Sequence, residues 1–174
     1  LDKEDYLSTY VMLDSALSKK FPNLKIVSDF HESVEKMRFL AKGQTMPEIE
    51  LKDKNGKTIK LSSLKGKVVL IDFWATWCGP CKAEIPTLKK LYTMYHDQGL
   101  EIYSVSVDQN KESWKNGILG KDWINVIDTE GVYAKKFEVE TIPYTILLDK
   151  DLKIVAKNLR STDLYLRVSD MFYR

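Results

Sequence analysis

Two cysteines, Cys78 and Cys81, are the only cysteines among the 174 residues of this chain. Their spacing of three would place them on neighbouring turns of a helix, close enough to form a disulfide. Such a pair can exchange electrons with another disulfide, because a thiolate attacks a disulfide sulfur and a second thiol then resolves the mixed disulfide. The pattern therefore indicates thiol–disulfide exchange.

The residues around the cysteines predict where the pair lies in the fold. A strongly apolar run precedes Cys78 and a helical pattern follows it, so we expect Cys78 at a helix N-terminus, where unpaired backbone N–H groups favour negative charge. This position should lower the pKa of Cys78 and make it the attacking thiolate, with Cys81 as the resolving thiol. Pro80 suits the first helical turn because it has no N–H group, and Gly79 leaves the approach to Cys78 open.

Three other interpretations of the cysteine pair compete with redox chemistry. Zinc needs four ligands, and His31 and His96, which alone could add to the sulfurs, do not form the close second pair of a zinc finger. A purely structural disulfide across so short a loop would stabilise the fold by only about 2 kcal/mol. Two inert buried thiols are disfavoured by a strand-to-helix position. Redox chemistry is the favoured interpretation.

Composition excludes several classes of protein. The chain is 44% hydrophobic and 30% charged, which is typical of a folded globular protein rather than a disordered one. Its 27 basic and 25 acidic residues give a net charge of +2, too small to indicate a nucleic-acid partner. No apolar run reaches 18 residues, so we expect no direct membrane insertion by this chain.

The elements that must position the cysteines can be predicted from periodicity. The apolar run 68–74 is typical of a central strand covered on both faces. A helix with an apolar stripe over 85–95 follows, and 102–107 is a second strand. Residues 67–107 are therefore expected to form a β-α-β unit with parallel strands.

Shorter elements complete the prediction. Two amphipathic helices are expected before residue 42, and the order expected from residue 67 onward is β-α-β-α-α-β-β-α. The shorter elements are a hairpin over 48–61, helices at 111–119 and 130–137, a hairpin of strands 144–148 and 153–156, and a terminal helix over 164–172.

These residues resemble a known family. The segment Trp77-Cys78-Gly79-Pro80-Cys81, with Thr141-Ile142-Pro143 before a strand, is similar to thioredoxin-fold oxidoreductases, and most similar to the bacterial TlpA/ResA branch of the AhpC/TSA–redoxin-like group. The stretches that add to the resemblance are 46–49, 66–75, 81–86 and 104–108. The resemblance implies an α/β, thioredoxin-like domain over 43–174, with a central mixed sheet flanked by helices. Residues 1–42 are then an N-terminal helical segment, similar to the end of a longer region that precedes such domains in some Bacteroidetes proteins.

The resemblance also implies a substrate-binding surface. Pro143 is expected in the cis form, facing the sulfurs, with the backbone of Ile142 turned towards Cys78 so that a substrate segment can pair with it as an added strand. Trp77 is expected beside the sulfurs as part of the docking surface, together with Gly79 and Pro80. Without the resemblance, Pro143 would be interpreted as an ordinary proline at the start of a strand.

Two carboxylic acids are candidates for proton transfer to and from Cys81. Asp72 lies within the apolar strand, where burial raises the pKa of a carboxyl group, and its position matches the buried acid of thioredoxin. Glu84 lies one helical turn after Cys81, and its position matches the acid of the ResA branch. Either acid could dominate, and the alternatives are that Glu84 is a solvated helix residue and Asp72 a satisfied core acid.

The implied activity is reduction of disulfides in exported proteins, because Gly-Pro between the cysteines is similar to the reducing members of the superfamily. No organic cofactor or metal is expected, and the partners are a protein disulfide substrate and an upstream membrane thiol donor. The expected location is the periplasm or cell envelope. The chain begins with Leu1 and not Met, so a signal or anchor is expected to have been lost from it.

Two rival functions remain. A peroxiredoxin-like peroxidase would need a Thr-x-x-Cys context and an arginine to hold peroxide, whereas Thr76 stands only two residues before Cys78 and no arginine lies near it in the sequence. A non-enzymatic binding module could use residues 1–42 as its partner surface. The intact cysteine pair argues against the module.

Overall fold

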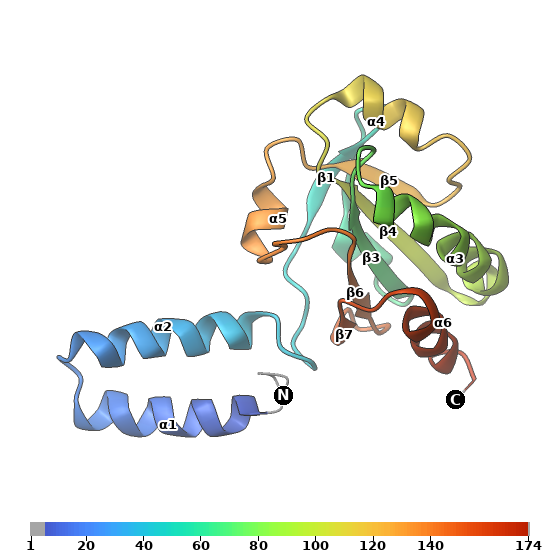
Figure 1. Ribbon diagram of the computed structural model, residues 1–174. Coiled ribbons are helices and arrows are strands. Elements are labelled where there is room, and N and C mark those ends of the chain that lie inside the picture. Colours follow the sequence, from blue (N-terminus) through green and yellow to red (C-terminus); the bar gives the residue numbers. More distant parts are fainter. Residues whose placement is uncertain (1–5, 174) are drawn as a thin grey trace. The chain divides into compact units, whose positions relative to one another are not determined.

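The computed structural model describes residues 6–173, and the chain divides after Gln44 into two compact units. The first unit contains the two helices predicted before residue 42. They are α1 (Leu7–Lys20) and α2 (Lys25–Phe39), which pack along each other (Figure 1).

Contacts between α1 and α2 are partly aromatic and partly ionic. The rings of Tyr10 and Phe30 lie 6.3 Å apart, and Val34 is fully buried. His31 Nδ1 lies 2.9 Å from the carboxylate of Asp14, and this hydrogen bond raises the pKa of His31. His31, which the sequence left without a partner, thus joins the two helices.

The second unit is built on a mixed sheet whose strand order is β2-β1-β5-β4-β3-β6-β7 among the described residues. The central strand β3 is parallel to β4 and antiparallel to β6, so the predicted parallel β-α-β unit is confirmed, as is the mixed sheet. The strands are β1 (Glu50–Asp53), β2 (Thr58–Lys60), β3 (Val68–Trp74), β4 (Leu100–Ser106), β5 (Ile124–Ile127), β6 (Tyr144–Leu148) and β7 (Ile154–Lys157).

Helices cover the sheet and close its core. On one face, α3 and α6 pack together over β3 and β4, and α5 lies on the other face (Figure 1). Phe137, directly after α5, packs against Phe73 with ring centroids 6.4 Å apart. The helices are α3 (Gly79–Tyr95), α4 (Lys111–Gly117), α5 (Val132–Lys136) and α6 (Ser161–Asp170), with 3₁₀ turns at Leu61–Leu64 and His96–Gln98. None of the helices in the described part of the chain has the length and apolar character needed to cross a bilayer.

The predicted order of elements is wrong at one point, because it lacks strand β5 between α4 and α5. β5 has four residues and lies between β4, to which it is parallel, and β1, to which it is antiparallel. Asn125 interrupts its apolar pattern, and the Asn125 side-chain amide donates to the carbonyl oxygens of Trp123 and Lys121. A short run with a turn-forming residue inside it gives too weak a strand signal to be recognised from sequence.

Candidate active site

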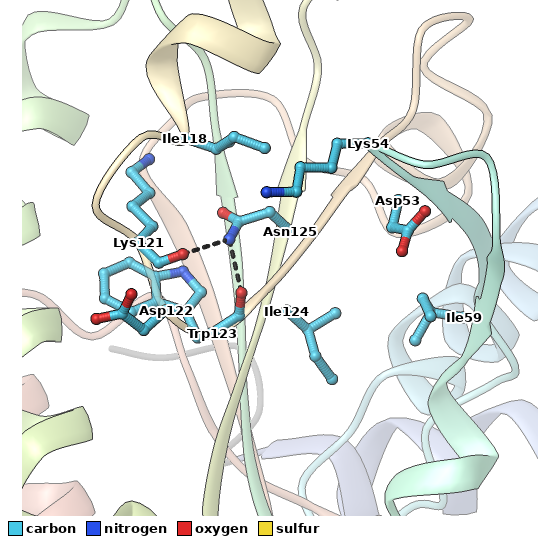
Figure 2. A pocket seen from close by; sticks show the side chains of 9 residues that line it. All are labelled: Asp53, Lys54, Ile59, Ile118, Lys121, Asp122, Trp123, Ile124 and Asn125. Carbon is cyan, nitrogen blue, oxygen red and sulfur yellow. Dashed lines mark hydrogen bonds between the residues drawn. The ribbon is translucent and has the colours of Figure 1, made fainter.

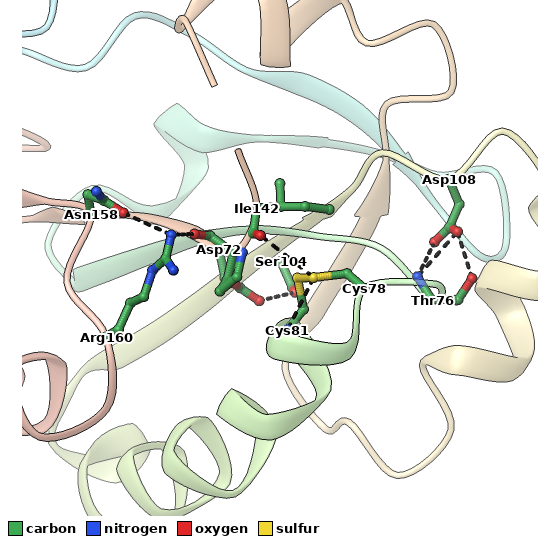
Figure 3. The surroundings of a disulfide bond; sticks show 10 residues. Asp72, Thr76, Cys78, Cys81, Ser104, Asp108, Ile142, Asn158 and Arg160 are labelled. Carbon is green, nitrogen blue, oxygen red and sulfur yellow. Dashed lines mark hydrogen bonds between the residues drawn. A yellow bond between two sulfur atoms is a disulfide. The ribbon is translucent and has the colours of Figure 1, made fainter. Parts of the chain in front are cut away.

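The two cysteines form a disulfide at the junction of β3 and α3, with an S–S distance of 2.02 Å and Cα atoms 5.3 Å apart (Figure 3). Cys78 is the N-cap of α3, and Gly79 and Pro80 are its first residues, as predicted. The backbone N–H of Cys81 donates to Cys78 Sγ over 3.1 Å. This is the amide contact that would stabilise a thiolate at Cys78 once the disulfide is reduced.

Accessibility differs sharply between the sulfurs and the side chain before them. Cys78 and Cys81 are only 5% and 3% exposed, whereas Trp77 is 69% exposed. Trp77 therefore presents its indole to solvent next to a sheltered disulfide, which suits a surface against which another chain could pack.

The backbone of Ile142 lies against the disulfide. The peptide bond between Ile142 and Pro143 is cis, as the resemblance implied, and Pro143 is buried. The carbonyl oxygen of Ile142 is 3.8 Å from Cys78 Sγ, and the Ile142 side chain packs against the cluster that contains both cysteines (Figure 3). The structure thus brings together residues from β3, α3 and the start of β6.

Asp72 is buried in β3, where Ser104 Oγ donates to its carboxylate over 3.0 Å. Burial raises the pKa of Asp72 from 3.8 to about 6, although the Ser104 hydrogen bond and the positive charge of Lys121 act in the opposite direction. The negative charge of Glu84 adds to the increase. A carboxyl group with this pKa can take up and release a proton near neutral pH.

Glu84 is 6% exposed, so the alternative of a solvated helix residue is wrong. The backbone N–H of Ser161, the first residue of α6, donates to Glu84 Oε1 over 2.7 Å, and the Ser161 hydroxyl donates to Oε2 over 3.3 Å. Helical periodicity could not predict this burial, because the partner is 77 residues further along the chain.

A surface pocket of about 330 Å³ beside β5 is lined in part by Lys121 and Trp123 (Figure 2). The Lys121 ammonium lies 3.0 Å from the centroid of the Trp74 ring. Trp74 is the last residue of β3 and stands two residues after Asp72. Burial lowers the pKa of Lys121 to about 8, while the charges of Asp72 and Asp108 oppose this shift. Lys121 therefore acts electrostatically on the site from a loop that the sequence did not associate with it.

Asp108 holds the loop that leads into Cys78. It is 2% exposed, and it accepts hydrogen bonds from the backbone N–H and the hydroxyl of Thr76 (Figure 3). It also accepts a hydrogen bond from the hydroxyl of Ser106. At Gly117 in α4, an added Cβ would lie 2.5 Å from Thr76 Cγ2, so this glycine allows α4 to approach the same loop. The sequence placed Asp108 in a family-like stretch but gave no indication of this role.

Asp108→Ala should lower the free energy of unfolding by about 2–3 kcal/mol, because it leaves buried donors without an acceptor. Urea denaturation of the oxidised protein measures this directly. Asp108→Asn, which keeps one acceptor oxygen, should lose less than the alanine variant. Equal stability of Asp108→Ala and the unchanged protein would contradict the assigned role.

An arginine also reaches the site from a distant part of the sequence. Arg160 Nη2 donates to the carbonyl oxygen of Pro143 over 2.9 Å and to Asn158 Oδ1 over 3.4 Å (Figure 3). The sequence had shown no arginine near Cys78, because residue 160 becomes a neighbour of the site only through the fold. Its guanidinium is bonded to protein carbonyl groups and not to a sulfur.

Comparisons with known proteins agree with this geometry. Residues 42–157 match the AhpC/TSA family. The thiol-disulfide oxidoreductase ResA of Bacillus subtilis is 37% identical over 118 residues, which cover 67% of this chain and 66% of that protein. The ResA of Bacillus cereus is 35% identical over 130 residues, which cover 74% of this chain and 73% of that protein. The thioredoxin domain of a thiol-disulfide oxidoreductase from Bacteroides vulgatus superposes with a TM-score of 0.72 at 38% identity, covering 76% of this chain and 99% of that domain.

Proposed function

The chain belongs to the AhpC/TSA family as a thioredoxin-fold thiol-disulfide oxidoreductase of the ResA type, and from this premise we propose that it reduces disulfides of exported proteins. The observation that carries the proposal is the N-cap position of Cys78. Its sulfur accepts the Cys81 N–H at the start of α3, and Cys81 is within disulfide distance.

In the first step, the Cys78 thiolate attacks one sulfur of the substrate disulfide. A bond forms between Cys78 Sγ and that sulfur, the substrate S–S bond breaks, and the second substrate sulfur leaves as a thiolate. Amide groups at the N-terminus of α3 stabilise the attacking anion.

In the second step, Cys81 loses its proton and attacks Cys78 Sγ. The Cys78–Cys81 disulfide forms, the mixed disulfide breaks, and both substrate sulfurs are released as thiolates that take up protons from the solvent, so two electrons have passed to the substrate. Asp72 is the better candidate to accept the Cys81 proton, since burial raises its pKa to about 6. Both oxygens of Glu84 already accept hydrogen bonds from Ser161, which favours a positioning role for Glu84.

Substrate would bind across Ile142 and Trp77. An extended segment can pair with the Ile142 backbone beside Cys78, while the exposed Trp77 indole and the open surface at Gly79 and Pro80 contact its side chains. The cycle needs no organic cofactor or metal. We place the protein in the periplasm or cell envelope, where an upstream membrane thiol donor would reduce the Cys78–Cys81 disulfide again.

The equilibrium reduction potential against glutathione tests the proposed direction. We expect a value near the ~−270 mV of thioredoxin, because Gly-Pro between the cysteines is typical of reducing members of the superfamily. Quantifying the thiol form by alkylation and mass spectrometry over a series of glutathione ratios gives the value. A potential near ~−120 mV, typical of a strong oxidant, would overturn the direction.

A further inference from the structure

The segment Asn158–Ser161, which links β7 to the first residue of α6, is bound to the strand that follows the substrate-facing backbone. The Asn158 N–H donates to the Thr145 carbonyl oxygen over 2.7 Å, and the Thr145 hydroxyl donates to the Leu159 carbonyl oxygen over 2.7 Å. Thr145 belongs to β6, which begins directly after Pro143. The segment is therefore fixed relative to the start of β6.

The same segment contacts the helix behind Cys81. Ser161 donates two hydrogen bonds to Glu84, which lies one turn after Cys81 in α3. Asn158 and Ser161 both have left-handed backbone conformations, with φ of 53° and 49°. A chain that turns sharply at two such positions is well determined by its surroundings.

Between these two anchors, Arg160 extends its side chain to the Pro143 carbonyl oxygen (Figure 3). The Pro143 carbonyl belongs to the residue directly after Ile142, whose own carbonyl oxygen is 3.8 Å from Cys78 Sγ. A guanidinium donor gives a charge-assisted hydrogen bond, which is stronger than one between neutral groups. The bond therefore restricts the backbone that would pair with a substrate.

We propose that Arg160 is a positioning residue for substrate binding, which holds the Pro143 carbonyl so that the adjoining Ile142 backbone stays ready to pair with an extended peptide beside Cys78. This inference rests on the proposed function. It concerns the binding of a peptide backbone and not the chemistry of the sulfurs. A disulfide compound without flanking peptide should therefore react independently of Arg160.

Two mixed disulfides of thionitrobenzoate can separate an effect on peptide binding from an effect on the reaction of the sulfurs. One carries an extended peptide with a single cysteine and the other carries cysteamine, so both release the same coloured thiolate when Cys78 attacks. With reduced protein, the maximal rate and the half-saturating concentration are measured in single turnovers. We expect Arg160→Met to raise the half-saturating concentration of the peptide compound by about 5- to 10-fold, with the maximal rate and the cysteamine reaction unchanged.

Two further variants keep the test decisive. Arg160→Lys retains a charged donor, so it should bind the peptide compound almost as well as the unchanged protein and better than Arg160→Met. Arg167→Met is the control: it removes an α6 arginine paired with Asp170 and should change neither reaction. Unchanged peptide affinity in Arg160→Met, an equal loss with both compounds, or no recovery in Arg160→Lys would overturn the inference. If the unchanged protein reacts with neither compound faster than Cys78→Ser, the proposed function itself fails.

Discussion

Cys78→Ser is expected to lower the rate of disulfide exchange by at least about 10³-fold, to the level of the uncatalysed background. The N-terminal amides of α3 favour an anion at this position, and a thiol can supply one near neutral pH whereas a serine hydroxyl cannot. The release of thionitrobenzoate from the peptide mixed disulfide measures the effect. A rate within tenfold of the unchanged protein would exclude Cys78 as the nucleophile.

The matched variant Cys81→Ser should separate the two steps. Cys78 remains able to attack, so thionitrobenzoate is still released. The peptide then stays bound to Cys78, because the resolving sulfur is missing. Mass spectrometry should detect one peptide per chain. Release of the peptide at the normal rate would show that Cys81 is not the resolving thiol.

Asp72→Asn is expected to raise the free energy of unfolding above pH 6 by about 3 kcal/mol. The pKa of Asp72 is about 6 in the fold against an ordinary value of 3.8, a difference of about 2 units. The native state therefore binds this proton more tightly than the unfolded chain does. The contribution of this protonated carboxyl group to the stability of the fold is complete below pH 4 and is lost as the pH rises towards 6. Above pH 6 the unchanged protein must bury an ionised Asp72, whereas the asparagine variant buries a neutral amide.

Urea denaturation of both oxidised proteins at pH 4 and pH 8 tests the expectation. The asparagine oxygen can still accept the Ser104 hydrogen bond, so the two proteins should differ little at pH 4 and clearly at pH 8. A difference of the same size at both pH values would mean that the effect arises from packing and not from ionisation.

Asp72→Asn should also slow the attack of Cys81 on the mixed disulfide by about 100-fold, because the proton of Cys81 loses its acceptor. The rate at which the peptide leaves Cys78, followed from pH 5 to pH 8, should lose its inflection near pH 6. Glu84→Gln is the matched comparison, since it removes the other buried acid. If Glu84→Gln removed the inflection and Asp72→Asn kept it, Glu84 would be the proton acceptor.

Local patterns were sufficient to predict the central part of the site. The apolar run that becomes β3 and the Cys-Gly-Pro-Cys turn that begins α3 depend mainly on neighbouring residues, so the sequence placed both cysteines and Asp72 correctly. The cis peptide bond before Pro143 was different. Its expectation came from the resemblance, because sequence alone gives such a bond only about a 5% frequency.

The remaining contacts depend on the fold as a whole. Asp108 contacts Thr76 across the ends of β4 and β3, and Ser161 contacts Glu84 although it lies 77 residues further along the sequence. Neither pair shares a helical or strand period, so no pattern within one segment could indicate it. Lys121 is similar, because its loop follows α4 and precedes β5, the strand that the sequence did not reveal.

The hydrogen bonds between Glu84 and the first residue of α6 limit how far this protein can be shortened. A truncated version ending at residue 160 would keep both cysteines, yet it would remove both hydrogen-bond donors of Glu84 and expose the apolar face of α3 that packs against Leu164 and Val168. Exposing this apolar surface to water would destabilise the domain. A minimal redox module excised from this chain must therefore include its final helix, however far that helix stands from the cysteines in the sequence.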